Sequence, residues 1–258
     1  MYQTISPPNH LKNYIQYFWE GKVELDGKSF FTNTATAASC PVWIFYLKGE
    51  FISDNTKLKN TSLFYGQTNR YGDYSAFQDA QIFGVQFHPY ALSYLFSIPT
   101  IELTNSVLDV QNLLGKEGKE IEEQLFLAET IEERARLIST YFESKLSGIS
   151  EKDQTIITAI ETVNQSGSNL NMDLLAKETY LSQRQFERRF KELSGFSPIS
   201  YSRIVRFEKA LNSLITNQQL TDIPFAHGYY DQAHFNNDFK SFTGYNPKKY
   251  LQVNELAI

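Results

Sequence analysis

The spacing of hydrophobic residues differs between the two halves of the chain. In residues 1 to about 100, short apolar runs such as 42–47 and 82–87 are rich in aromatic and β-branched side chains, and turn-forming residues separate them. Beyond about residue 150, apolar residues recur three or four positions apart, as on one face of a helix. The pattern predicts an α+β protein with two domains: a small antiparallel β-barrel or sandwich with flanking helices, then an all-helical domain.

The domain boundary is expected in the short polar stretch at residues 147–151, which lies between two helical patterns. We therefore expect a first domain at residues 1–147 and a second at residues 152–258. Within the first domain, residues 9–19 have a helix-like start that places four apolar residues on one face, namely Leu11, Tyr14, Ile15 and Phe18.

Two further helices are predicted between residues 117 and 146. The second begins with Thr130 and Glu133 at capping-box spacing. It carries an apolar stripe at the spacing of a helix face, formed by Ile131, Ala135, Ile138 and Phe142. The stripe has two interpretations: it packs against the barrel of its own chain, or it is the seam of a homodimer.

One sequence pattern occurs twice near the end of the chain, 49 residues apart. The first copy covers residues 181–198 and the second covers residues 230–247. Each copy has a polar N-cap, a helix with two phenylalanines four positions apart, and a glycine followed by a proline that ends it. Each copy is therefore predicted to be the second half of a helix-turn-helix unit.

A helix that reads DNA enters the major groove with polar residues forward and its apolar face held by a supporting helix. The first copy offers Arg for guanine, Gln for adenine and Glu for cytosine, and the second offers amides and an alanine. Double-stranded DNA is thus the expected partner. The alternative is an ordinary amphipathic bundle with solvated charges. The predicted DNA-binding residues are Gln183, Arg184, Glu187 and Arg188 in the first copy and Gln232, Ala233, Asn236 and Asn237 in the second.

The net charge of −5 alone would disfavour a nucleic-acid partner, but its distribution does not. Residues 151–258 carry equal numbers of basic and acidic residues, so the whole deficit lies in residues 1–150. Residues 182–209 contain seven basic and three acidic side chains, a local net charge of +4. A local basic patch can attract phosphate groups on an acidic protein.

Other chemistry is sparsely indicated. Cys40 is the only cysteine, and the four histidines lie at no metal-binding spacing, so we expect no disulfide, metal or cofactor. An enzyme with Cys40 as nucleophile and His88 as base is a remote alternative, because no catalytic motif surrounds either residue. No apolar run reaches 18 residues and the start is unlike a secretory signal, so a cytoplasmic protein without membrane contact is expected.

Residues 155–251 resemble the tandem helix-turn-helix domain of AraC-type (AraC/XylS) transcription regulators. The first copy of the motif and the segment Asp231–Phe235 carry the resemblance. It implies a DNA-binding regulator, most often an activator that contacts RNA polymerase, whose two recognition helices enter successive major grooves about 34 Å apart. Three positions depart from the family pattern: Pro224, Asn237, and Asp238, which adds a negative charge.

Residues 8–19 and the segment Gly84–Pro89 resemble the cupin-like sensor domain that precedes some AraC-type units. This resemblance implies a β-barrel that binds a small effector, without the metal-binding histidines of other cupins. The effector candidates are Trp19, Trp43, Tyr46, Tyr65, Arg70, Phe87 and His88. Two alternatives stay open: the aromatic residues fill the barrel core, or the first domain only dimerises a constitutive DNA-binding protein.

Overall fold

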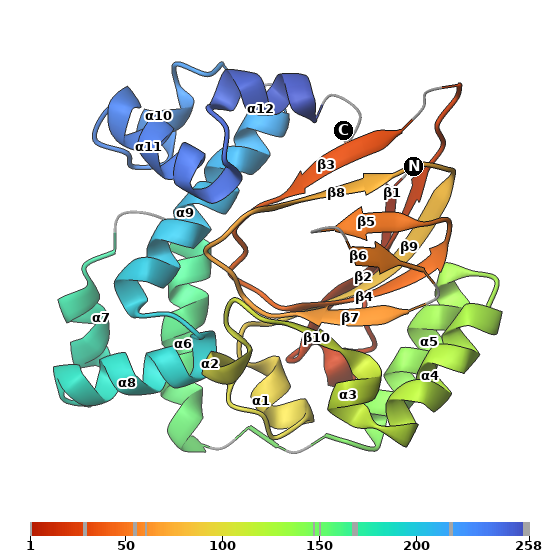
Figure 1. Ribbon diagram of the computed structural model, residues 1–258. Coiled ribbons are helices and arrows are strands. Elements are labelled where there is room, and N and C mark those ends of the chain that lie inside the picture. Colours follow the sequence, from red (N-terminus) through yellow and green to blue (C-terminus); the bar gives the residue numbers. More distant parts are fainter. Residues whose placement is uncertain are drawn as a thin grey trace.

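A computed structural model gives the fold, with a β-rich N-terminal part and an all-helical C-terminal part side by side (Figure 1). Ser147, at the end of the predicted first domain, lies outside the described residues. The structure describes residues 2–27, 30–53, 56–59, 61–146, 148–149, 151–166, 170–216 and 219–254.

The strands described form two antiparallel sheets that face each other (Figure 1). The six-stranded sheet has the order β1 (Tyr2–Ile5), β2 (Ile15–Val23), β9 (Ala80–Phe87), β4 (Val42–Lys48), β7 (Ser62–Tyr65), β10 (Val107–Asp109). The four-stranded sheet has the order β3 (Phe31–Ala35), β8 (Gly72–Ala76), β5 (Phe51–Ser53), β6 (Thr56–Leu58).

The predicted α+β class with a β-rich first part is confirmed, and of the two predicted arrangements the closed barrel is wrong, because two separate sheets face each other as in a sandwich (Figure 1). No ladder joins the two sheets in the described residues, so both sheets are open. The spacing of apolar runs along a sequence reports how many strands form. It does not report which outer strands pair, and barrel closure depends on that pairing.

The helix expected at residues 9–19 is also wrong. Only Asn9–Leu11 form a short 3-10 helix, η1, and Ile15 begins strand β2. The register of β2 against β9 shifts between Ile15 and Tyr17, as at a β-bulge. The extra residue turns Ile15 and Phe18 to the same buried side, which imitates the three-residue spacing of a helix.

Five α-helices accompany the sheets: α1 (Ala91–Leu95), α2 (Thr100–Leu103), α3 (Val110–Leu114), α4 (Lys116–Leu127) and α5 (Ile131–Glu143). The predicted capping box of Thr130 and Glu133 is present at the start of α5. The stripe of α5 is buried in one core with Phe18, Trp43 and Phe83 of the six-stranded sheet. Packing against its own chain is therefore the correct interpretation, and the stripe is not free to form a dimer seam.

The C-terminal part contains α6 (Glu151–Ser166), α7 (Met172–Glu178), α8 (Gln183–Ser194), α9 (Pro198–Ile215), α10 (Ile223–Ala226), α11 (Gln232–Thr243) and α12 (Pro247–Val253). Helix α9 runs between the two repeat copies (Figure 1). Ala37 and Tyr90 of the β-rich part join the helical core. Within the described ranges, no helix has the length and hydropathy needed to span a membrane.

Candidate functional site

Helix α8 is positioned by its caps and by two phenylalanines. The side chain of Ser182 accepts a hydrogen bond from the backbone amide of Gln185, and the Gln185 side chain accepts one from the Ser182 amide at 3.0 Å. Phe186 and Phe190 are fully buried. Gly195 ends the helix with φ of 81°, in the left-handed region that glycine adopts readily. The opposite face of α8 therefore points to solvent.

The structure brings the four predicted α8 contacts together on this exposed face: Gln183, Arg184, Glu187 and Arg188. Gln183 Nε2 donates a hydrogen bond to Glu187 Oε1 at 3.0 Å. Arg188 Nη1 donates to Glu192 Oε1 at 2.9 Å. Arg184 has no such partner among the described residues. Arg184 can therefore bind another molecule without first giving up a bond.

Helix α11 repeats this construction. The Asp231 side chain accepts a hydrogen bond from the His234 amide at 2.7 Å, and Phe235 and Phe239 are fully buried. Gly244 ends the helix with φ of 78°. The outer face carries the four predicted contacts, of which Asn236 is half-buried and the others are exposed: Gln232, Ala233, Asn236 and Asn237. These four residues are amides and one alanine, and the exposed cation Lys240 lies only in the last turn of the helix.

The predicted +4 patch is not a free basic surface. Arg189 binds Asp153 and Glu192, and Lys209 Nζ donates to the Gln165 carbonyl at 2.7 Å. Arg203 and Arg206 are occupied within the helical domain. The basic residues of the segment that remain exposed on α8 are Arg184, Arg188 and Lys191. Positive charge thus concentrates on the first recognition helix.

Asp238 holds the two remaining arginines. Its carboxylate accepts hydrogen bonds from Arg203 Nη2 at 2.7 Å and Arg206 Nη2 at 3.2 Å, and 6% of its side chain is exposed. The Arg206 guanidinium also lies 4.4 Å from the centroid of the Tyr229 ring. Asp238 therefore links α11 to α9, and its negative charge is neutralised instead of facing the reading surface as the sequence suggested.

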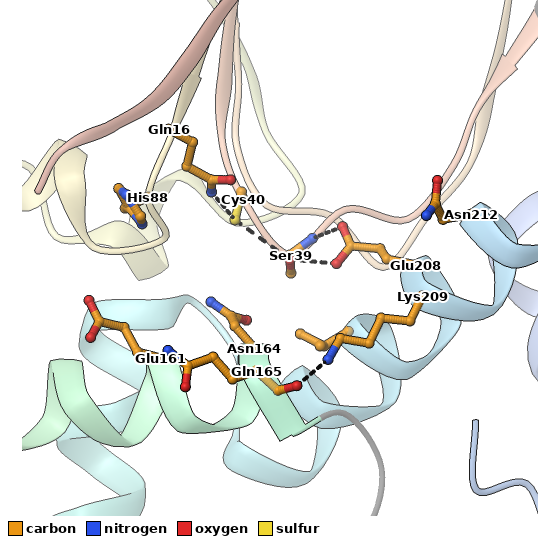
Figure 2. Close-up of a pocket in the computed structure, with 11 residues that line it drawn as sticks. Gln16, Ser39, Cys40, His88, Glu161, Asn164, Gln165, Glu208, Lys209 and Asn212 are labelled. Carbon is orange, nitrogen blue, oxygen red and sulfur yellow. Dashed lines mark hydrogen bonds between the residues drawn. The ribbon is translucent and has the colours of Figure 1, made fainter. Parts of the chain in front are cut away.

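A cavity of about 600 Å³ lies between the β-rich and helical parts (Figure 2). At its wall, the Glu208 carboxylate accepts hydrogen bonds from the Ser39 amide at 2.9 Å and the Ser39 hydroxyl at 2.6 Å. Burial raises the pKa of Glu208, and the two hydrogen bonds from Ser39 offset part of this increase. Glu208 lies on α9, so this contact joins the two parts of the chain.

Cys40 and His88 both line this cavity, as Figure 2 shows, but they do not form a catalytic pair. The bonding partners of the Cys40 sulfur are Gln16 at 3.1 Å and Ser39 at 3.6 Å. Burial, together with the charge of Glu208, raises the pKa of the thiol to about 12, so it stays protonated. His88 Nε2 lies 3.0 Å from the Lys12 carbonyl. A nucleophile with its base is therefore not assembled here.

The predicted effector residues fall in several places. Trp43 and Phe87 are fully buried in the core between the six-stranded sheet and its helices. Trp43 Nε1 donates a hydrogen bond to Ser62 Oγ at 2.9 Å. Arg70 is exposed after β7, and His88 lines the cavity between the two parts. None of these four side chains lies on the face of the six-stranded sheet that is turned toward the four-stranded sheet.

The face of the six-stranded sheet that is turned toward the four-stranded sheet carries Trp19, Tyr46 and Tyr65. The Trp19 ring covers Gly84 so closely that a Cβ there would lie 2.1 Å from it. The hydroxyls of Tyr46 and Tyr65 are 2.6 Å apart, and Tyr46 packs in a small core drawn from both sheets. On the side toward the helices the central aromatic residues Phe18, Trp43 and Phe83 are fully buried, whereas several side chains on this face are half-buried: Trp19, Ile44, Leu63, Tyr65 and Ile82. We call this face the inter-sheet face.

Two protein-family models match the chain. Residues 175–252 match a model described as a helix-turn-helix domain. Residues 3–109 match a domain of unknown function, DUF6597. No curated protein sequence matches the chain. The helical part therefore contains an AraC-type helix-turn-helix domain, as the repeated motif predicted, and the chain is a DNA-binding transcription regulator and not an enzyme.

Solved structures similar to the whole chain include several of ToxT from Vibrio cholerae. One, at 1.65 Å resolution, has a TM-score of 0.54 and 11% identity, covering 98% of each chain. An apo ToxT variant has a TM-score of 0.51 and 12% identity, covering 92% of this chain and 97% of ToxT. A third, bound to (E)-4-(8-methylnaphthalen-1-yl)but-3-enoic acid, has a TM-score of 0.50 and 13% identity, covering 88% of this chain and 99% of ToxT. At these identities the similarity shows a shared two-part fold.

Proposed function

We propose that α8 and α11 read successive major grooves on one face of DNA, with α8 supplying the stronger contacts. The observation that carries this proposal is the repeated geometry: two capped helices, each anchored by two buried phenylalanines, present exposed polar side chains from their first turns. Arg184 and Arg188 suit guanine, whereas the amides of α11 suit adenine and positioning contacts. The two helices therefore contribute unequally.

Selection of bound DNA from a random pool tests this proposal directly. We expect a site with two motifs about 10.5 base pairs apart, the spacing of one helical turn, with guanine prominent in one motif. A site with a single motif would assign all sequence discrimination to one helix. Failure of the full-length protein to enrich any sequence would overturn the proposal.

For the direction of regulation we propose activation, which the AraC-type resemblance supports, with RNA polymerase as the partner. Transcription in vitro from a promoter that carries the selected site tests it. Added protein should increase transcript from that promoter and leave a promoter without the site unchanged. A decrease would instead identify a repressor.

We propose that a small effector binds at the inter-sheet face. Trp19 and Tyr65 are half-buried on this face, Tyr46 is buried beside them, and all three are uncharged, so the face suits an uncharged aromatic or apolar molecule with a hydrogen-bonding group. The ToxT structure with a bound naphthalene-containing acid supports a ligand on this fold.

Effector binding has an expected optical signature, because the two tryptophans of the chain differ in environment. Trp19 lies on the inter-sheet face, whereas Trp43 is fully buried in the core. A binding metabolite should raise Tm by a few degrees and change tryptophan emission. Trp19→Phe should abolish the emission change. If no member of a broad metabolite panel raises Tm, the alternative of a constitutive DNA-binding protein is favoured.

The contacts between the two parts suggest how an effector would alter DNA binding. The segment between β3 and β4 runs from the four-stranded to the six-stranded sheet and touches the helical part twice. The Ala37 amide donates to the Phe242 carbonyl at 3.1 Å, and Ser39 binds Glu208. A change in sheet separation would therefore move contacts on α9 and α11. A homodimer is also proposed, through a surface other than the buried stripe of α5.

A further inference from the structure

Two tyrosines next to the recognition helices are unusually exposed. Tyr180 is 97% exposed and Tyr230 is 87% exposed, which makes them the two most exposed large hydrophobic residues in the described part of the chain. Neither ring packs against another described aromatic ring. A tyrosine normally buries much of its ring and finds a partner for its hydroxyl. The fold therefore gains little from either side chain.

Tyr180 also carries backbone strain. Its φ is 55°, in the left-handed region that is unfavourable for residues with a Cβ atom. In the second helix-turn-helix unit the turn before α11 uses Gly228, with φ of 69°, for the same kind of conformation. Glycine meets this need without strain. The chain thus keeps an exposed tyrosine where the conformation favours glycine, and such strain is often found at functional positions.

Both tyrosines lie where the edge of a DNA major groove would be if the recognition helices were bound. Tyr180 precedes the N-cap of α8, Ser182, by two residues, and Tyr230 directly precedes the N-cap of α11, Asp231. When the first turn of a recognition helix enters the major groove, residues just before its N-cap lie beside the sugar-phosphate backbone. Arg184 lies on the first turn of the helix that follows Tyr180, four residues further along the chain.

We propose that Tyr180 and Tyr230 bind the DNA backbone at the edges of the two grooves, with each hydroxyl donating a hydrogen bond to a phosphate oxygen. The proposal rests on the proposed function of α8 and α11 as DNA readers. Contacts to phosphate set the register of a protein on the duplex and carry no base information. The two tyrosines therefore fix how deeply each recognition helix enters its groove.

The test measures Kd for the selected DNA site across a range of salt concentrations, together with Tm, for full-length variants. Tyr180→Phe and Tyr230→Phe should each weaken binding about tenfold, the usual effect of losing a hydrogen bond to a charged group. Because no cation is lost, the slope of log Kd against log salt should not change. Tyr2→Phe, at a 62% exposed position in β1, is the matched control and should bind as the wild type does.

Tyr180→Gly separates a DNA contact from a structural role. Glycine relieves the strain at φ of 55°, so Tm should be retained or raised while binding weakens at least as much as in Tyr180→Phe. A lower Tm with unchanged DNA affinity in Tyr180→Gly would overturn the proposal. Wild-type DNA affinity in both Tyr180→Phe and Tyr230→Phe would also overturn it. If wild type binds the site and Arg184→Ala weakens it while the tyrosine variants do not, this inference fails and the proposed function stands.

Discussion

Replacing Arg184 with alanine should weaken binding to the selected DNA site by about 1 to 3 kcal/mol, or about 5- to 150-fold in Kd. Arg184 is exposed on the first turn of α8 and has no ion-pair partner in the described residues. Its two hydrogen bonds to a guanine would be gained without breaking an internal bond. Arg188 would first have to leave Glu192, so Arg188→Ala should cost less.

The measurement compares the selected site with a site in which the guanine of the stronger motif is changed. Arg184→Ala should lose the difference between the two sites as well as affinity, because a base contact carries discrimination. Arg136→Ala removes the same charge from an exposed position on α5 and should change neither. Equal weakening on both sites would show that Arg184 contacts phosphate and does not read a base.

The sequence predicted those features that depend on neighbours along the chain. The caps at Thr130 and Ser182 and the buried pairs of phenylalanines in α8 and α11 follow from residues within one helix or its flanks. Local hydrogen bonds and the helical period determine them, so they can be recognised without the fold. The repeated pattern was informative for the same reason.

Features that depend on distant partners were missed. The bulge in β2 gave Ile15 and Phe18 a helix-like spacing, and only the pairing with β9 reveals it. Trp43 and Tyr46 lie three positions apart in one strand, so Trp43 packs under the helices and Tyr46 toward the second sheet, and only the fold shows what covers each face. The +4 patch counted arginines whose carboxylate partner lies 32 residues away or more. Spacing alone cannot identify such partners.

Asp238→Ala should destabilise the second helix-turn-helix unit by about 3 kcal/mol, the lower end of the cost of breaking a buried ion pair. The lower end applies because Arg203 is half-exposed and can regain water, whereas Arg206 is only 13% exposed and would stay buried without its partner. In a protein of this size the loss should lower Tm by about 6 to 12 °C. Thermal unfolding followed by circular dichroism measures it.

Asp238→Asn keeps the shape of the side chain and one hydrogen-bond acceptor, so it should lose less stability than Asp238→Ala. Asp173→Ala, on the exposed surface of α7, is the control and should change Tm only slightly. On DNA, loosening α11 from α9 should reduce affinity for a site with both motifs and leave affinity for the α8 motif alone nearly unchanged. Wild-type stability in Asp238→Ala would show that this ion pair is not what holds α11 on α9, and the second unit would then depend on the buried aromatic contacts of Phe239 and Phe242 with Phe207.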